Sequence, residues 1–148
     1  MRVRHAVGIA LAVALLAPAG ATVSAQTPAP ALKKMAPPLR GTVEVGYMQS
    51  AKLEGNTIVT TFEVKNLSAT GSIVGLNVTE FWYDKPGGEL LQGTGDRQRL
   101  RTPLGPGEVA TITLKSPKVP GMTKESKPQY KFAYQNGDVK LKAMKSLK

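Results

Sequence analysis

Hydrophobic and polar residues alternate along most of the chain after residue 40, with the period of two that is typical of β-strands. The clearest run covers residues 56–66, where Ile58, Thr60, Phe62 and Val64 share one face. Further strand candidates span residues 42–50, 72–83, 89–93, 97–102 and 109–115. Turns rich in Pro and Gly separate these short runs, and no helical periodicity interrupts them. The pattern therefore predicts an all-β fold.

A charged residue, Glu80, interrupts the alternation of the long run at 72–83. Three aromatic residues follow it at once, Phe81–Tyr83. A β-bulge near Thr79–Glu80 would let the apolar face resume at Phe81, and we expect one there. The pattern alone leaves open whether Phe81 or Trp82 points into the core.

Residues 130–144 read Y-K-F-A-Y-Q-N-G-D-V-K-L-K-A-M, with Asn136-Gly137 between two alternating runs. An Asn-Gly pair in this position predicts a β-hairpin with a two-residue type I′ turn. The hairpin register places the apolar residues on one face: Tyr130, Phe132, Tyr134, Val139, Leu141 and Ala143. A valine in place of Gly137 would destabilise such a turn.

The same register places Lys131 opposite Lys142 on the other face of the hairpin, with Lys140 diagonal to them. Like charges directly opposite each other destabilise a strand pair. Two interpretations of these lysines remain open. They protect an exposed sheet edge against aggregation, or an anionic partner neutralises them.

The first 25 residues have the layout of a secretory signal peptide. A basic stretch containing Arg2 and Arg4 precedes an apolar run, Val7–Leu16, and the small residues of Val23–Ala25 form a cleavage site. The apolar run is too short to span a membrane. Residues 26–40 are rich in proline and predict an extended tether, and residues 41–145 form the domain. We expect an exported protein, periplasmic or secreted, with no transmembrane span after cleavage.

Three stretches of the chain resemble the FxLYD-type and related immunoglobulin-like domains of exported bacterial proteins. They read F-E-V-K-N-L-S, L-N-V-T-E-F-W-Y-D-K-P-G-G and L-G-P-G-E-V-A-T-I-T-L, within about residues 58–114. Asn66 ends a strand, Tyr83-Asp84 precedes a glycine turn, and Leu104 opens a Pro-Gly turn, as in those domains. Lys85-Pro86 and the basic C-terminal segment depart from them. The resemblance implies an immunoglobulin-like fold and an accessory, binding or scaffold role, and it transfers no active site.

The pattern and the resemblance together predict an immunoglobulin-like β-sandwich of about seven antiparallel strands that ends in the 130–144 hairpin.

The formal net charge of the 148 residues is +10. The C-terminal segment 115–148 carries much of it, with nine lysines against Glu125 and Asp138. Such asymmetry favours anionic partners, although it also serves solubility. The segment 97–101 adds three arginines on one strand face, about 6.6–7 Å apart. The candidate anion-binding residues are Arg97, Arg99, Arg101, Lys131, Lys140 and Lys142.

The chain has no cysteine, and its one histidine, His5, lies in the signal peptide. Disulfides, thiolate nucleophiles and the common zinc ligands are therefore absent from the mature chain. Glu80 and Asp84 form the most plausible acid pair, which a carboxylate-based hydrolase would need. The structural alternative has Asp84 bonding to turn backbone and Glu80 at the bulge or on an exposed face.

We expect no enzyme activity, no cofactor and no metal site. The expected function is a non-catalytic binding, accessory or scaffold module of the bacterial cell envelope. Its partner is a protein or an anionic envelope polymer, and nucleic acid is the less favoured anion. The alternative is an electrostatic binder of anionic polymer or membrane surface through a basic face, and a carboxylate-based hydrolase comes third. The ligand and the oligomeric state stay open.

Overall fold

Seven β-strands and no helix make up residues 35–148, the residues that this computed structural model describes. The strands are β1 (Val43–Glu54), β2 (Thr57–Asn66), β3 (Asn77–Tyr83), β4 (Arg97–Arg99), β5 (Val109–Pro117), β6 (Lys127–Ala133) and β7 (Val139–Ala143). The predicted signal peptide and residues 26–34 of the predicted tether lie outside the described residues. The predicted all-β class and its seven strands are confirmed.

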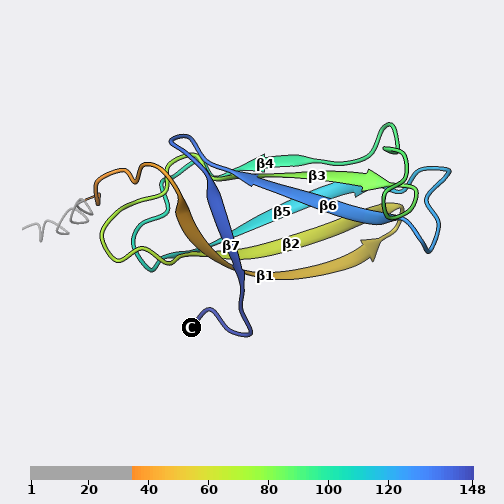
Figure 1. The fold of residues 1–148 in the computed structure, drawn as a ribbon. Coiled ribbons are helices and arrows are strands. Elements are labelled where there is room, and N and C mark those ends of the chain that lie inside the picture. The colour runs from red at the N-terminus through yellow and green to blue at the C-terminus, as the bar shows by residue number, and fades with distance from the viewer. Residues whose placement is uncertain (1–34) are drawn as a thin grey trace, which may run out of the picture. The chain divides into compact units, whose positions relative to one another are not determined.

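The strands form two sheets that pack face to face as a β-sandwich (Figure 1). One sheet has four strands in the order β5-β2-β1-β7, and the other has three in the order β4-β3-β6. Every pairing is antiparallel except that of β1 with β7, which is parallel. The prediction of an all-antiparallel fold is therefore wrong at this one edge.

Strand β2 alternates as predicted: its apolar side chains lie on the face that is shielded from water, and its polar side chains lie on the other face. Phe62 and Val64 are fully enclosed, and their neighbours Glu63 and Lys65 face outward. Residues 37–39 of the predicted tether also join the fold. Leu39 donates its backbone N–H to the Ser72 carbonyl at 2.9 Å and packs against the core.

The predicted 130–144 hairpin is wrong, because its two strands belong to different sheets. β6 pairs with β3, and β7 pairs with β1. Only an isolated bridge between Tyr134 and Gly137 joins the two halves. Lys131 and Lys142 are therefore not cross-strand neighbours.

The segment between β6 and β7 crosses from one sheet to the other. Gln135 donates to the Val74 carbonyl at 3.1 Å, and Asp138 donates to the Gly41 carbonyl at 3.2 Å. The Tyr134 hydroxyl also donates to the Gly41 carbonyl. After the crossing, Val139 of β7 packs against the same core as Tyr130 and Phe132 of β6. The other two residues of the predicted apolar face of β7, Leu141 and Ala143, are exposed. A hairpin would have placed both strands in a single sheet.

Gly137 has a φ of +157°, far from the left-handed value of a type I′ turn, so the predicted turn does not form. A glycine is required for another reason, since a Cβ built on Gly137 would collide with the Gly41 carbonyl group. The backbones of the crossing and of the chain entering β1 touch at this point.

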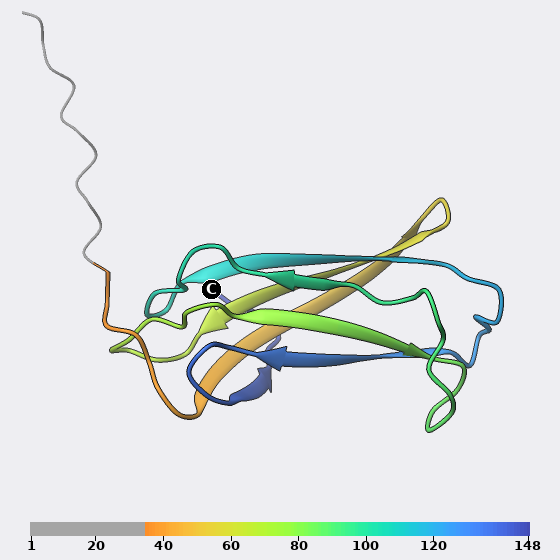
Figure 2. The same cartoon turned by 90° about the horizontal axis from the view of Figure 1, so that it is seen from above.

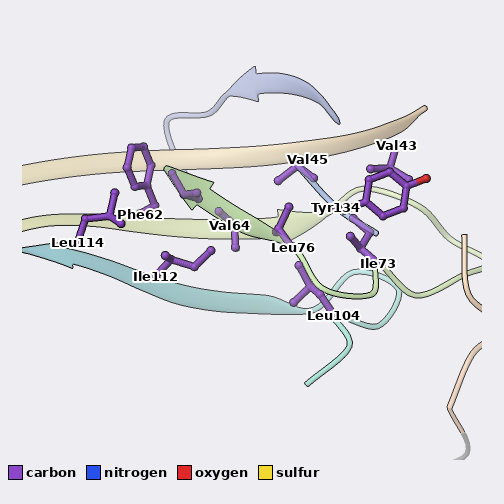
Figure 3. Packing of buried hydrophobic residues seen from close by; sticks show 11 residues of the cluster. Val43, Val45, Phe62, Val64, Ile73, Leu76, Leu104, Ile112, Leu114 and Tyr134 are labelled. Atoms are coloured by element: carbon purple, nitrogen blue, oxygen red, sulfur yellow. The ribbon is translucent and has the colours of Figure 1, made fainter. Parts of the chain in front are cut away.

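The core lies between the two sheets (Figure 3) and draws on strands and loops alike. Its fully buried members include Val45, Phe62 and Val78. Aromatic side chains bridge the sheets, since the Phe62 ring packs edge-on against the rings of Tyr130 and Phe132, with centroids 4.8 and 5.2 Å away. The alternation predicted for β6 is thus right, although its partner strand is not the predicted one.

The predicted bulge near Thr79–Glu80 is also wrong. The register of β3 with β6 is continuous from Asn77 to Tyr83, so Glu80 keeps its place in the alternation and points inward. Its side chain is 2% exposed. Trp82 then follows on the inner face, at 8% exposed, and Phe81 lies half-buried on the outer face.

Candidate anion-binding face

The outer face of the three-stranded sheet gathers the largest group of the predicted site residues. Directly paired residues on neighbouring strands share a face of a sheet, so the register lists its members. We call these ten residues the basic sheet face: Asn77, Thr79, Phe81 and Tyr83 from β3, Arg97 and Arg99 from β4, and Lys127, Gln129, Lys131 and Ala133 from β6.

Two rows of the register set the positions of the cations. Arg97, Thr79 and Lys131 form one row across the sheet, and Arg99, Asn77 and Ala133 form the next. Neighbouring strands lie about 4.8 Å apart, so Arg97 and Lys131 flank Thr79 at about 10 Å from each other. Their side chains can reach toward one anionic group between them.

A shallow hollow of about 440 Å³ lies over the Arg99 end of this face. Gly75, Asn77, Arg97, Arg99, Ala133, Tyr134 and Gln135 line it. The Arg99 guanidinium lies against Gly75, where any Cβ would meet it, and its Nη2 donates to the Gln135 Oε1 at 3.5 Å. Gly75 has a φ of +68°, which also favours glycine. The backbone therefore makes room for Arg99 to lie across the end of β3.

Two aromatic rings lie on the other half of the same face. Phe81 and Tyr83 are half-buried, opposite Gln129 and Lys127 of β6. The sequence prediction missed these residues as site candidates because it placed a bulge at Glu80. Unbroken alternation through β3 would have assigned both rings to the outer face.

No carboxylate belongs to the basic sheet face. Asp96, which precedes Arg97, accepts hydrogen bonds from the backbone N–H groups of Arg97 at 2.7 Å and of Lys115 in β5 at 2.8 Å. Among residues 35–148 the ion pairs join Lys52 to Glu54 and Lys140 to Glu44, both away from this face. The four cations of the face therefore have no carboxylate partner within the described part of the chain.

The remaining candidates are placed apart from this face. Lys140 and Lys142 lie on β7 in the other sheet, opposite Glu44 and Gly46. Lys140 is 3.1 Å from the Glu44 carboxylate. Arg101 follows the end of β4 and lines a second hollow of about 500 Å³ beside Arg99. The six predicted residues thus separate into Arg97, Arg99 and Lys131 together, Arg101 beside them, and two lysines elsewhere.

The predicted acid pair does not share a cleft. The Glu80 carboxylate is enclosed between the sheets, where it accepts hydrogen bonds from the hydroxyls of Thr60 at 3.1 Å and Ser116. Asp84 is in the turn after β3 and accepts the backbone N–H groups of Lys85 and Glu89 at 2.7 and 2.8 Å. The expectation that Asp84 bonds to turn backbone is confirmed, and the expectation of a bulge or exposed site for Glu80 is wrong.

The inner face of β6 meets the same buried carboxylate. The Tyr130 hydroxyl lies 3.4 Å from Thr60 Oγ1. Burial, together with the nearby Glu80 carboxylate, raises the pKa of Tyr130 to about 12. The Trp82 Nε1 is buried nearby in β3 without a hydrogen-bond partner. The inner face of this sheet therefore holds an acidic side chain, whereas the outer face holds basic ones.

Residues 35–148 contain no cluster of three or more acidic, histidine or cysteine side chains that could hold a metal ion. The same residues contain no helix of the length and hydropathy needed to cross a bilayer. Comparison of the chain with protein-family models, with curated proteins and with solved structures finds no match.

Proposed function

We propose that this protein is an exported, non-catalytic binding module that holds an acidic polymer of the cell envelope on its basic sheet face. The observation that carries the proposal is the gathering of Arg97, Arg99, Lys127 and Lys131 on one exposed face without a carboxylate. Cations that share a face act on an anionic chain together and raise its local concentration. Scattered surface cations lack this joint effect.

The length of the face supports a polymer as the ligand. Six residue steps separate Asn77 from Tyr83 along β3, which corresponds to about 20 Å. Arginine guanidinium groups can bind carboxylates or phosphates through two parallel hydrogen bonds, and Arg97 and Arg99 lie at one end. Phe81 and Tyr83 offer flat apolar surface at the other end, against which sugar rings can pack. An acidic polysaccharide combines both features.

Export and the lack of catalysis rest on the chain's chemistry. The signal-peptide pattern at residues 1–25 supports export. The absence of cysteine, and of histidine after residue 5, leaves few groups for acid–base or nucleophilic chemistry. The enclosed Glu80 and the turn residue Asp84 do not supply a joint site.

Binding of the mature chain, residues 26–148, to polygalacturonate tests the proposal, with neutral dextran as the control polymer and phosphatidylglycerol vesicles as a membrane surface. We expect binding to polygalacturonate that weakens steeply as salt rises, because the face is exposed to solvent ions. Stronger binding to the vesicles would favour the membrane reading. Absence of binding to every anionic probe at low salt would reject the proposal.

A matched pair of triple variants locates the site. Arg97→Gln, Arg99→Gln and Lys131→Gln together remove three charges from the basic sheet face, and Lys118→Gln, Lys140→Gln and Lys142→Gln remove three charges elsewhere. We expect the first variant to lose about tenfold in affinity, since three exposed contacts at about 0.5 kcal/mol each amount to that ratio. The second should change affinity by about twofold or less. Equal losses would show that net charge and not the face determines binding.

A further inference from the structure

Half of strand β1 has a free edge. β7 pairs only with Val43–Tyr47, and the last bond between them runs from the Met144 N–H to the Tyr47 carbonyl at 3.0 Å. The chain then turns away from β1, and the Leu147 carbonyl accepts a hydrogen bond from the Lys65 Nζ at 3.0 Å. The stretch Met48–Glu54 pairs with β2 on one side and with no strand of residues 35–148 on the other.

Alternation along β1 identifies the backbone groups on this edge. The Tyr47 carbonyl points toward β7, whereas the Glu44 carbonyl accepts the Leu67 N–H on the β2 side. Successive residues of a strand direct their N–H and C=O groups to opposite sides. Gln49, Ala51 and Leu53 therefore present both groups to the free edge.

The backbone of this stretch has no feature that blocks another strand. The register with β2 is continuous from Val45 to Glu54, so there is no bulge, and the stretch contains no proline. Regular exposed edges of this kind are templates for strand pairing. Figure 2 shows the turn between β1 and β2 projecting beyond the strands of the other sheet. Leu53, which shares the inner face with Ile58, is consequently 58% exposed.

We propose that the free edge of β1 pairs with the same edge of a second copy, antiparallel about a twofold axis at Ala51. This register sets Gln49 opposite Leu53 and Ala51 opposite its own counterpart on the inner face. On the outer face it sets Ser50 opposite Lys52 and Met48 opposite Glu54. The pairing satisfies the free backbone groups of Gln49, Ala51 and Leu53 in both copies and joins the two four-stranded sheets into one.

The charges of the edge fit a second copy of this chain. The net charge of the chain is +10, so most of its surface repels another copy. The stretch Met48–Glu54 is locally neutral, because Lys52 and Glu54 form an ion pair. The proposed register sets no like charges directly opposite each other. Because β1 lies in the other sheet, this inference does not depend on the basic sheet face.

Sedimentation of the mature chain across about 1 μM to 1 mM tests the proposal, since weak dimers have dissociation constants in that range. We expect a shift from monomer to dimer with rising concentration. Ala51→Pro should remain monomeric and keep the thermal stability of the parent to within a few degrees. The N–H it removes faces the free edge and not β2, and proline is tolerated at such positions. Hydrogen exchange at Gln49, Ala51 and Leu53 should slow with concentration in the parent only.

Disulfide formation by an introduced cysteine tests the proposed register directly, because the chain has no cysteine of its own. Opposed residues of an antiparallel pair are close enough for a disulfide, so Ala51→Cys should form covalent dimers under mild oxidation. Ala69→Cys, at another exposed alanine, is the control and should form far fewer. A monomer at every concentration overturns the proposal, as does a dimer that Ala51→Pro leaves intact. Uptake of an unrelated extended peptide along this edge by a monomeric chain overturns it as well.

Discussion

Strands β6 and β7 come from one continuous lysine-rich stretch of sequence, yet their lysines meet different surroundings. Lys131 of β6 shares a row with Arg97 and has no carboxylate partner among the described residues. Lys140 of β7 lies opposite Glu44 and forms an ion pair with it. The same residue type thus adds to a positive surface at Lys131 and is neutralised at Lys140. The neighbouring strand, not the local sequence, decides whether a lysine belongs to a candidate site.

The largest effect should come from breaking the crossing that separates the two strands. Gly137→Val places a side chain against the Gly41 carbonyl group. The backbone at Gly41 cannot move away without losing the hydrogen bond that the Asp138 N–H donates to this carbonyl. We expect destabilisation by about 2–4 kcal/mol, measured by urea unfolding, because the clash is with backbone and not with a flexible side chain.

Gly87→Val serves as the control for that experiment. Gly87 has a φ of +71° but open space around it, so its valine variant carries only the conformational cost, about 1–2 kcal/mol. An equal loss of stability in the two variants would mean that backbone contact at the crossing is unimportant.

A smaller effect, dependent on pH, concerns the inner face of β6. Burial raises the pKa of Tyr130 to about 12, whereas an unfolded tyrosine titrates near 10. The folded state therefore binds this proton more tightly, and the resulting stability, present below about pH 10, is lost as the pH rises toward 12.

Tyr130→Phe removes that dependence together with the contact to Thr60. We expect it to cost about 0.5–1 kcal/mol at pH 7, and we expect the difference from the parent to shrink between about pH 10 and 12. Urea unfolding at several pH values measures both. Burial also raises the pKa of Tyr134, but that residue is common to both proteins. A difference that stays constant with pH would contradict the assignment to Tyr130.

The smallest effects on stability should come from replacing Lys131 and Lys140 one at a time. Lys140→Gln removes an exposed ion pair and should destabilise by about 0.5 kcal/mol or less. Lys131→Gln relieves repulsion from Arg97 and should be neutral or slightly stabilising by a similar amount. Thermal unfolding at low salt measures both, and high salt should reduce the contrast. Effects of the same sign and size would remove the distinction between the strands.

Much of the fold could be predicted from alternation. The inward faces of β2 and β6 and the turn role of Asp84 follow from side-chain period and turn chemistry, which depend only on nearby residues. Less of the candidate site could be predicted from the sequence. Arg97, Arg99 and Lys131 were identified as cations, but their gathering on one face depends on β3, which pairs with both β4 and β6 and is distant from each of them in sequence.

The errors have a common cause in Glu80 and Gly137. A carboxylate is costly to bury, so the pattern favoured a bulge, yet hydroxyls from Thr60 and Ser116 satisfy it inside the sandwich. An Asn-Gly pair favours a hairpin, yet the Tyr134 side chain and the Gly41 backbone hold that segment in a crossing. In both places a partner far along the chain overrides a local preference.

The sequence by itself determined the β class of this protein, the inward and outward sides of most strands, the lack of cysteine and the excess of positive charge. Those properties follow from side-chain period and composition, which need no knowledge of strand partners. The tertiary structure alone decided the separation of β6 from β7, the burial of Glu80 and the gathering of four cations on the basic sheet face. Strand pairing is non-local, and the free energy of burying two apolar faces against one core selected partners that a local pattern does not specify.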